Sequence, residues 1–119
     1  MVMHVIHALA EVDVDRTIVV VGHGAERVTK KVQEQAPGWA HVTFVEQTVQ
    51  RGTGDAAMVG MTAIPGDDLD DDSTIIILPG DTPLLRADTL RQLVATHLSS
   101  GNAATAITSV LEDPTGYGR

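Results

Sequence analysis

The sequence predicts an α/β fold with a mainly parallel sheet, and three observations support this class. Segments with helical periodicity alternate with short apolar runs that suit strands. Residues 75–78 (IIIL) form an unbroken apolar run, as expected for a strand covered on both faces. Regular alternation of helix and strand is typical of parallel sheets with helical crossovers. No internal repeat or linker divides the 119 residues, so we expect one domain or part of one.

The first predicted elements follow from spacing and β-branched content. In the segment 3–12, apolar residues lie three and four positions apart, which suits an amphipathic helix. The segment 16–22 (RTIVVVG) is rich in β-branched residues and suits a buried strand that ends in glycine. The polar segment 25–35 keeps Val28 and Val32 four residues apart, which predicts a helix with one buried stripe.

The remaining elements continue the alternation. The segment 41–46 (HVTFVE) is predicted as a strand, and 54–64 (GDAAMVGMTAI) as a helix rich in small residues. A strand begins at Ser73 and contains the apolar run described above. The segment 88–99 has four apolar residues on one helix face, and 103–111 (AATAITSVL) is predicted as a further strand.

The composition excludes several function classes. Eight basic and 16 acidic residues give a formal charge of −8, and without a basic stripe we expect no nucleic-acid partner. No apolar run approaches the roughly 18 residues of a membrane span, and no signal peptide is recognisable, so we expect no membrane partner. The absence of cysteine excludes thiolate chemistry and is compatible with a cytoplasmic protein. The acidic run 66–72 lacks the glycine and glutamate of a calcium loop and is interpreted as a solvated turn.

Three clusters of candidate functional residues follow predicted strands, at the sheet edge where ligands of parallel sheets bind. They are 47–55 (QTVQRGTGD), 79–81 (PGD) and 113–119 (DPTGYGR). Backbone N–H groups of the Gly-Thr-Gly turn could meet an anion or a base edge, or Thr53 could simply cap the next helix. Asp81 could hold a metal ion or a sugar hydroxyl, or could cap the following helix. The third cluster could be a binding loop or a plain turn.

The histidines are weaker candidates. His4 and His7 have a spacing that can chelate a metal ion, but without an evident third ligand we favour a structural or solvent-exposed role. His23, which follows the first predicted strand, could face the cleft, but we favour packing within its loop.

Taken in order, these clusters resemble one family. The residues Gln47, Arg51-Gly52-Thr53-Gly54, Gly80-Asp81-Thr82-Pro83-Leu84 and Asp113 to Arg119 are similar to motifs of the uridyltransferase domain of GlmU, the bacterial N-acetylglucosamine-1-phosphate uridyltransferase. The resemblance implies a Rossmann-like nucleotide-diphospho-sugar transferase (GT-A-like) fold, with residues 1–119 forming part of that domain. It also implies transfer of UMP from UTP to N-acetylglucosamine 1-phosphate, which yields UDP-N-acetylglucosamine and pyrophosphate with Mg²⁺ as cofactor.

The resemblance also implies roles for individual residues. Gln47 matches the residue that reads the uracil edge, and a glutamine amide offers both a donor and an acceptor for that purpose. Gly52 and Thr53 match the turn that contacts the uridine. Pro79, Gly80 and Asp81 match the segment near the ribose and the sugar, with Asp81 as the catalytic magnesium ligand. Gly118 matches a glycine whose backbone meets the N-acetyl sugar.

The chain departs from the family at several points. We expect the first, central strand and the phosphate-binding loop to lie outside the sequence, together with the second metal ligand and the β-helix domain through which the family forms homotrimers. Only Arg51 and Arg119 lie in the candidate site, which is little positive charge for a triphosphate. We therefore expect residues 1–119 to be inactive on their own. Alternatives are transfer to another sugar or alcohol phosphate, and a non-catalytic uridine-nucleotide binding module.

Overall fold

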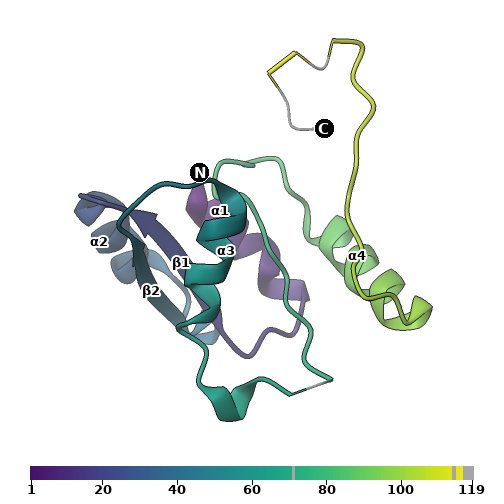
Figure 1. Cartoon of the computed structure of the whole chain (residues 1–119), viewed down its shortest axis with the longest axis horizontal. Coiled ribbons are helices and arrows are strands. Elements are labelled where there is room, and N and C mark those ends of the chain that lie inside the picture. Colours follow the sequence, from purple (N-terminus) through teal and green to yellow (C-terminus); the bar gives the residue numbers. More distant parts are fainter. Residues whose placement is uncertain (71, 114, 117–119) are drawn as a thin grey trace.

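The computed structural model describes residues 1–70, 72–113 and 115–116 of the chain (Figure 1). In this part of the chain, four α-helices and two β-strands are joined by loops and short 3-10 turns. The elements are α1 (Val2–Ala8), β1 (Thr17–Gly22), α2 (Glu26–Gln35), β2 (Val42–Gln47), α3 (Thr53–Met61) and α4 (Ala87–Ser100). None of these helices combines the length and the apolar character needed to cross a bilayer.

The centre of the fold is a parallel pair of strands. β1 and β2 run side by side with Thr17 opposite Val42 at one end and Gly22 opposite Gln47 at the other. The helix α2 connects them, as a parallel pair requires. The predicted parallel α/β class is therefore confirmed, and the carboxyl ends of both strands meet at one edge.

Side chains of the strands alternate between two covered faces. Val19 is buried in a cluster with Ile6 of α1 and Val32 of α2, and Phe44 of β2 packs against this cluster. Figure 1 shows α1 and α2 behind the sheet and α3 in front of it. Because successive strand residues point to opposite faces, the neighbours of Val19 face α3 instead.

The helix α3 comes close to the sheet through a glycine. Gly60 is buried, and a Cβ atom built on it would lie 3.1 Å from Cγ2 of Val20 and 4.0 Å from Cγ2 of Ile18. Even a methyl group at this position would require Val20 of β1 to shift by a few tenths of an ångström. The small residues of α3 thus set the spacing between the helix and the sheet.

A second cluster attaches α4 to the rest of the molecule. Leu90 is fully buried against Ala8 and Leu9, and the half-buried Leu78 and Leu85 pack against the same cluster. The predicted apolar face of α4 is only partly covered, since Leu98 remains 64% exposed. The second core is therefore small and draws on residues before and after the central strands.

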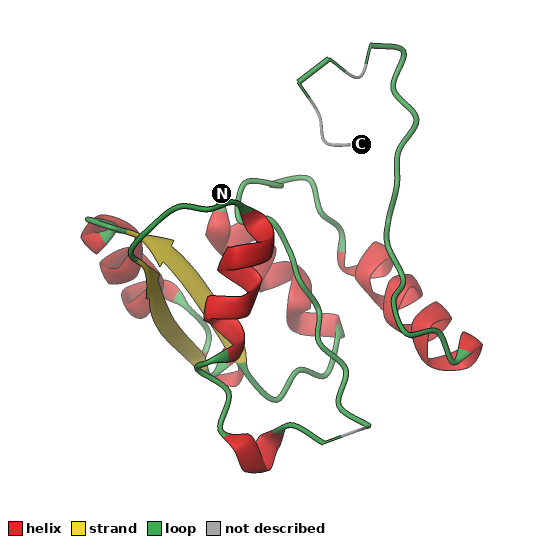
Figure 2. Cartoon of the chain, viewed as in Figure 1, coloured by secondary structure: helices red, strands yellow, loops and turns green. Residues whose placement is uncertain are grey.

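Two predicted strands are wrong. The segments 73–79 and 103–111 form neither strand nor helix, and Figure 2 draws both as loops. The physical reason is that a strand forms only beside another strand, and in the described residues the sheet contains β1 and β2 alone. Apolar side chains that were predicted to lie in a covered strand are consequently exposed, including Ile75 at 44% and Ile77 at 66%.

The first helix is also shorter than predicted. It ends at Ala8, and a 3-10 turn follows over Leu9–Glu11. The other predicted helices and the first two strands form, with bounds that differ by at most three residues from the expectation. Such differences are usual at frayed ends of elements.

Candidate functional site

The candidate site lies at the carboxyl edge of the sheet. Gly22 ends β1 directly opposite Gln47, which ends β2. The loop after β2 then folds back so that Nε2 of Gln50 would lie 2.7 Å from a Cβ atom on Gly22. A glycine at this position therefore admits the Gln50 side chain beside the strand end. This is the edge at which open parallel sheets bind ligands.

Gln47 is the only buried polar residue in the described part of the chain, at 8% exposed. Its Nε2 atom donates to Oδ2 of Asp55 at 2.6 Å and to the carbonyl oxygen of Gly52 at 3.4 Å. A buried amide needs such partners, because an unsatisfied one would cost about 1–3 kcal/mol. The Gln47 side chain is thus held between the strand end and the start of α3.

The turn before α3 depends on glycine. Gly52 is the N-cap of the helix and has φ +96° and ψ −179°, a backbone conformation that is essentially restricted to glycine. Thr53 is the first helical residue, so the alternative that Thr53 caps this helix is wrong. The Gly52 carbonyl accepts the N–H of Ala56 at 3.1 Å, which anchors the first turn.

An open hollow of about 250 Å³ lies beside this turn. Its lining includes Gln47, Arg51 and Asp55, with Val59 of α3 contributing an apolar wall. Arg51 is the only positively charged residue of the lining within the described residues. The hollow therefore offers a ligand a polar strand end, an apolar wall, one cation and two carboxylates, those of Glu46 and Asp55.

An exposed pair borders the hollow. Nδ1 of His23 lies 2.8 Å from Oε1 of Glu46, and Glu46 also belongs to the lining. The His23 side chain is 89% exposed, so the predicted packing of this residue within its loop is wrong. His4 and His7 are exposed on α1, in agreement with a solvent-exposed role.

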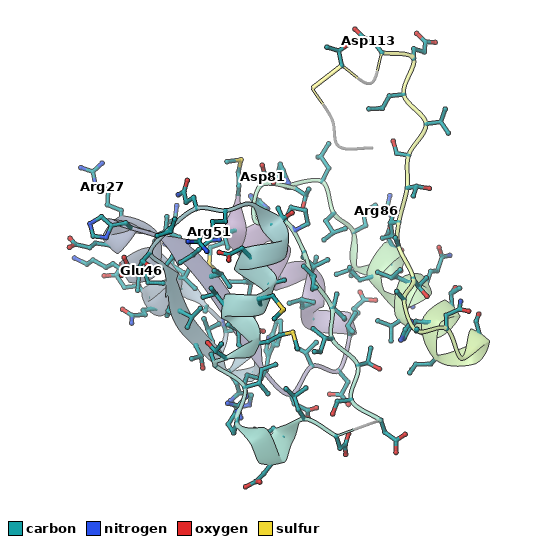
Figure 3. All side chains as sticks on the ribbon, viewed as in Figure 1. Arg27, Glu46, Arg51, Asp81, Arg86 and Asp113 are labelled. Atoms are coloured by element: carbon teal, nitrogen blue, oxygen red, sulfur yellow. The ribbon has the colours of Figure 1, made fainter. Side chains whose placement is uncertain are left out.

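The segment 79–81 forms a turn next to the start of α1. A Cβ atom on Gly80 would lie 3.9 Å from Cγ2 of Val2, and the hydroxyl of Thr82 donates to the carbonyl oxygen of Pro79 at 3.0 Å. Pro79, Gly80 and Asp81 are all exposed. Figure 3 shows Asp81 toward the upper side of the molecule, the side to which the β1 arrow points in Figure 1.

Asp81 does not cap the following helix. The helix α4 begins at Ala87 and its N-cap is Arg86, five residues beyond Asp81, so this alternative is wrong. Within the described residues, Asp81 does not belong to any group of three or more His, Asp or Glu side chains that could surround a metal ion. Its carboxylate is instead a single exposed oxygen donor.

The third cluster is only partly described. Gly118 lies outside the described residues, together with Pro114, Tyr117 and Arg119. Asp113 accepts the backbone N–H of Thr115 at 3.0 Å, and hydrogen bonding with Thr115 lowers the pKa of the Asp113 carboxyl. Figure 3 shows Asp113 away from the layers that carry Arg51 and Glu46.

Sequence reasoning missed the part played by Asp55. The structure brings its carboxylate onto Gln47, eight residues earlier. One signal in the sequence could have indicated this contact. Asp55 is an acidic residue in the first turn of a helix that directly follows a strand with a polar end, and such a residue lies beside that strand end.

The comparisons with known proteins agree with this geometry. The chain is 44% identical over 116 residues to the bifunctional protein GlmU of Thermobifida fusca, covering 98% of this chain. It is 41% identical over 119 residues to bifunctional protein GlmU of Thermoanaerobacter pseudethanolicus, covering the whole chain. The chain spans 23% and 24% of the length of these two relatives. A model of the MobA-like NTP transferase domain matches residues 1–117, and with the parallel sheet and its glycine turn this shows that the chain belongs to that family.

Proposed function

We propose that residues 1–119 are part of a uridyltransferase domain that forms UDP-N-acetylglucosamine and pyrophosphate from UTP and N-acetylglucosamine 1-phosphate. The reaction would take place in the cytoplasm and supply a precursor of the peptidoglycan cell wall. The whole protein would be a homotrimer, as the family resemblance implies. The observation that carries the proposal is the buried Gln47 amide, which is held beside the Gly52 turn at the carboxyl edge of the sheet.

Gln47, Gly52 and Thr53 are the proposed uridine-binding residues. Gln47 belongs to the lining of the hollow, so a base edge placed there would lie beside this residue. Because Gly52 has no side chain, a nucleotide could approach the backbone of this turn closely. Another residue would be strained at these backbone angles. Arg51 in the same lining would attract the phosphates of the nucleotide.

Asp81 is the proposed magnesium ligand. Mg²⁺ usually keeps several waters and is held by one or two carboxylates together with substrate phosphates. A single exposed carboxylate at the upper side of the molecule fits this requirement. When bound, the ion supplies positive charge for the phosphates, and phosphoryl-type transfer depends mainly on such neutralisation and on positioning. Pro79, Gly80 and Gly118 would contact the ribose and the sugar.

Isothermal titration calorimetry tests this proposal. The protein is titrated with UTP and with UDP-N-acetylglucosamine, each with and without Mg²⁺. We expect both to bind and Mg²⁺ to strengthen the binding of UTP. Gln47→Met should weaken both ligands, whereas Gln33→Met on the exposed surface of α2 serves as the matched control and should not. Asp81→Asn should remove the Mg²⁺ effect, and Asp67→Asn is its control.

The same titrations separate the alternatives. Tighter binding of another nucleoside triphosphate than of UTP would favour transfer to a different sugar or alcohol phosphate. Binding without release of pyrophosphate by the complete protein would favour a uridine-nucleotide binding module. Failure to bind UTP and UDP-N-acetylglucosamine would contradict the proposal.

A further inference from the structure

The hydrogen bonds of Gln47 determine which atom of its amide a ligand can meet. An amide group has two N–H donors and one acceptor oxygen. The Nε2 atom, which carries both donors, lies 2.6 Å from Oδ2 of Asp55 and 3.4 Å from the Gly52 carbonyl oxygen, so both of its hydrogen-bond contacts are within the protein. The Oε1 atom of Gln47 is therefore the atom left to accept a hydrogen bond.

The carboxylate of Asp55 fixes this orientation. An ionised carboxylate only accepts hydrogen bonds, so the Gln47 oxygen cannot take the place of its nitrogen without facing another acceptor. The Gly52 carbonyl is also an acceptor, so it too favours the nitrogen of the Gln47 amide over the oxygen, but this contact is longer. Charge-assisted hydrogen bonds are roughly twice as strong as neutral ones, so Asp55 dominates the choice.

A purely structural role for Asp55 explains less. Acidic residues are common in the first turn of a helix, where they stabilise the helix dipole or bond back to the N-cap amide. Asp55 occupies this turn of α3. Its side-chain hydrogen bond, however, goes to Gln47 of β2. The carboxylate thus connects two elements at the candidate site.

We propose that Asp55 is a positioning residue that sets base specificity by holding the Gln47 amide with its oxygen toward the hollow. This inference rests on the proposed uridine-nucleotide binding. An acceptor in the hollow matches the ring N3–H of uracil. Cytosine has no N–H at that position, because its N3 is itself an acceptor. Asp55 would therefore favour one pyrimidine over the other by orienting the Gln47 amide.

The test uses Asp55→Asn, which keeps the size of the side chain but permits either amide orientation at Gln47. The matched control is Asp88→Asn, because Asp88 also lies in the first turn of a helix, α4, and does not contact Gln47. We expect Asp55→Asn to reduce the preference for UTP over CTP about tenfold, which corresponds to one charge-assisted hydrogen bond. The control should keep the preference of the unmodified protein.

A second measurement needs no nucleotide. In ¹H–¹⁵N spectra, the side-chain amide signals of Gln47 should move in Asp55→Asn and stay in place in Asp88→Asn. Unchanged Gln47 signals would overturn the inference whether or not nucleotide binds, as would an unchanged preference for UTP. If the signals move but the unmodified protein binds no uridine nucleotide, the positioning of Gln47 is supported and the proposed function and its base specificity fail.

Discussion

Replacing Gly52 by alanine tests the turn on which the candidate site depends. The backbone of Gly52, at φ +96° and ψ −179°, lies in a region that costs other residues about 1–3 kcal/mol. No atom lies within 4 Å of a Cβ atom built there, so the cost comes from the backbone alone. We expect Gly52→Ala to lower the free energy of unfolding by this amount.

Gly54 provides a matched control two residues away. It lies inside α3, and again no atom lies within 4 Å of an added Cβ. Alanine is favoured over glycine in a helix by about 0.5–1 kcal/mol, so Gly54→Ala should stabilise the protein slightly. The two variants should therefore differ by about 1.5–4 kcal/mol in opposite directions from the unmodified protein.

Urea denaturation followed by circular dichroism measures both values. If the transition is cooperative, the midpoints give the difference directly. Equal midpoints for Gly52→Ala and Gly54→Ala, or a stabilised Gly52→Ala, would refute the reasoning. Such a result would mean that the turn adopts another conformation in solution, and that Gln47 is then held differently.

Two further predictions concern the second core and an acidic turn. Leu90→Ala should lower the free energy of unfolding by about 2–5 kcal/mol, because the Leu90 side chain is fully buried. Leu98 is 64% exposed, so Leu98→Ala should change this free energy by less than about 0.5 kcal/mol in the same urea assay. Equal losses of stability in the two variants would contradict the packing of α4. The hydrogen bond from the Ser73 hydroxyl lowers the pKa of the Asp70 carboxyl, so the associated stability is present above the ordinary pKa and is lost as pH falls through the lowered one. Ser73→Ala should raise the pKa of Asp70 toward its ordinary value in an NMR titration and leave Asp113 unchanged, and an unmoved Asp70 would count against this hydrogen bond.

The elements that depend on local pattern could be predicted from the sequence. The strands at 17–22 and 42–47 and the helices at 26–35 and 87–100 form close to their predicted bounds. Their apolar spacing and β-branched content favour one structure without reference to distant residues. The parallel arrangement followed from the alternation of these elements.

The structure of the segment that begins at Ser73 could not be predicted from its local pattern alone. Its apolar run favours a covered strand, but strand formation is decided by a neighbour that supplies hydrogen bonds. Residues 75–78 lie beside neither β1 nor β2 in the described pairing. The local pattern therefore showed only that the segment favours a strand, and tertiary context overrode this preference.

The candidate site was predictable in part for the same reason. Gln47 and Gly52 were expected near one edge because both follow a predicted strand, and the structure brings them into contact. The hydrogen bond between Gln47 and Asp55 could not be predicted, since it depends on how α3 returns along the sheet. The position of Asp81 relative to Gln47 likewise depends on the path of a long loop.

The close approach of α3 to β1 makes Gly60, which does not line the hollow, part of the mechanical support of the candidate site. Gly60 and Asp55 lie five residues apart on one helix, which corresponds to about 7.5 Å along its axis. A bulkier residue at 60 would push α3 away from Val20 as a rigid rod, and Asp55 would move with it. A displacement of about 1 Å would stretch the 2.6 Å bond to Gln47 beyond ordinary hydrogen-bond length. The base selection proposed above would then depend on how closely α3 packs against β1.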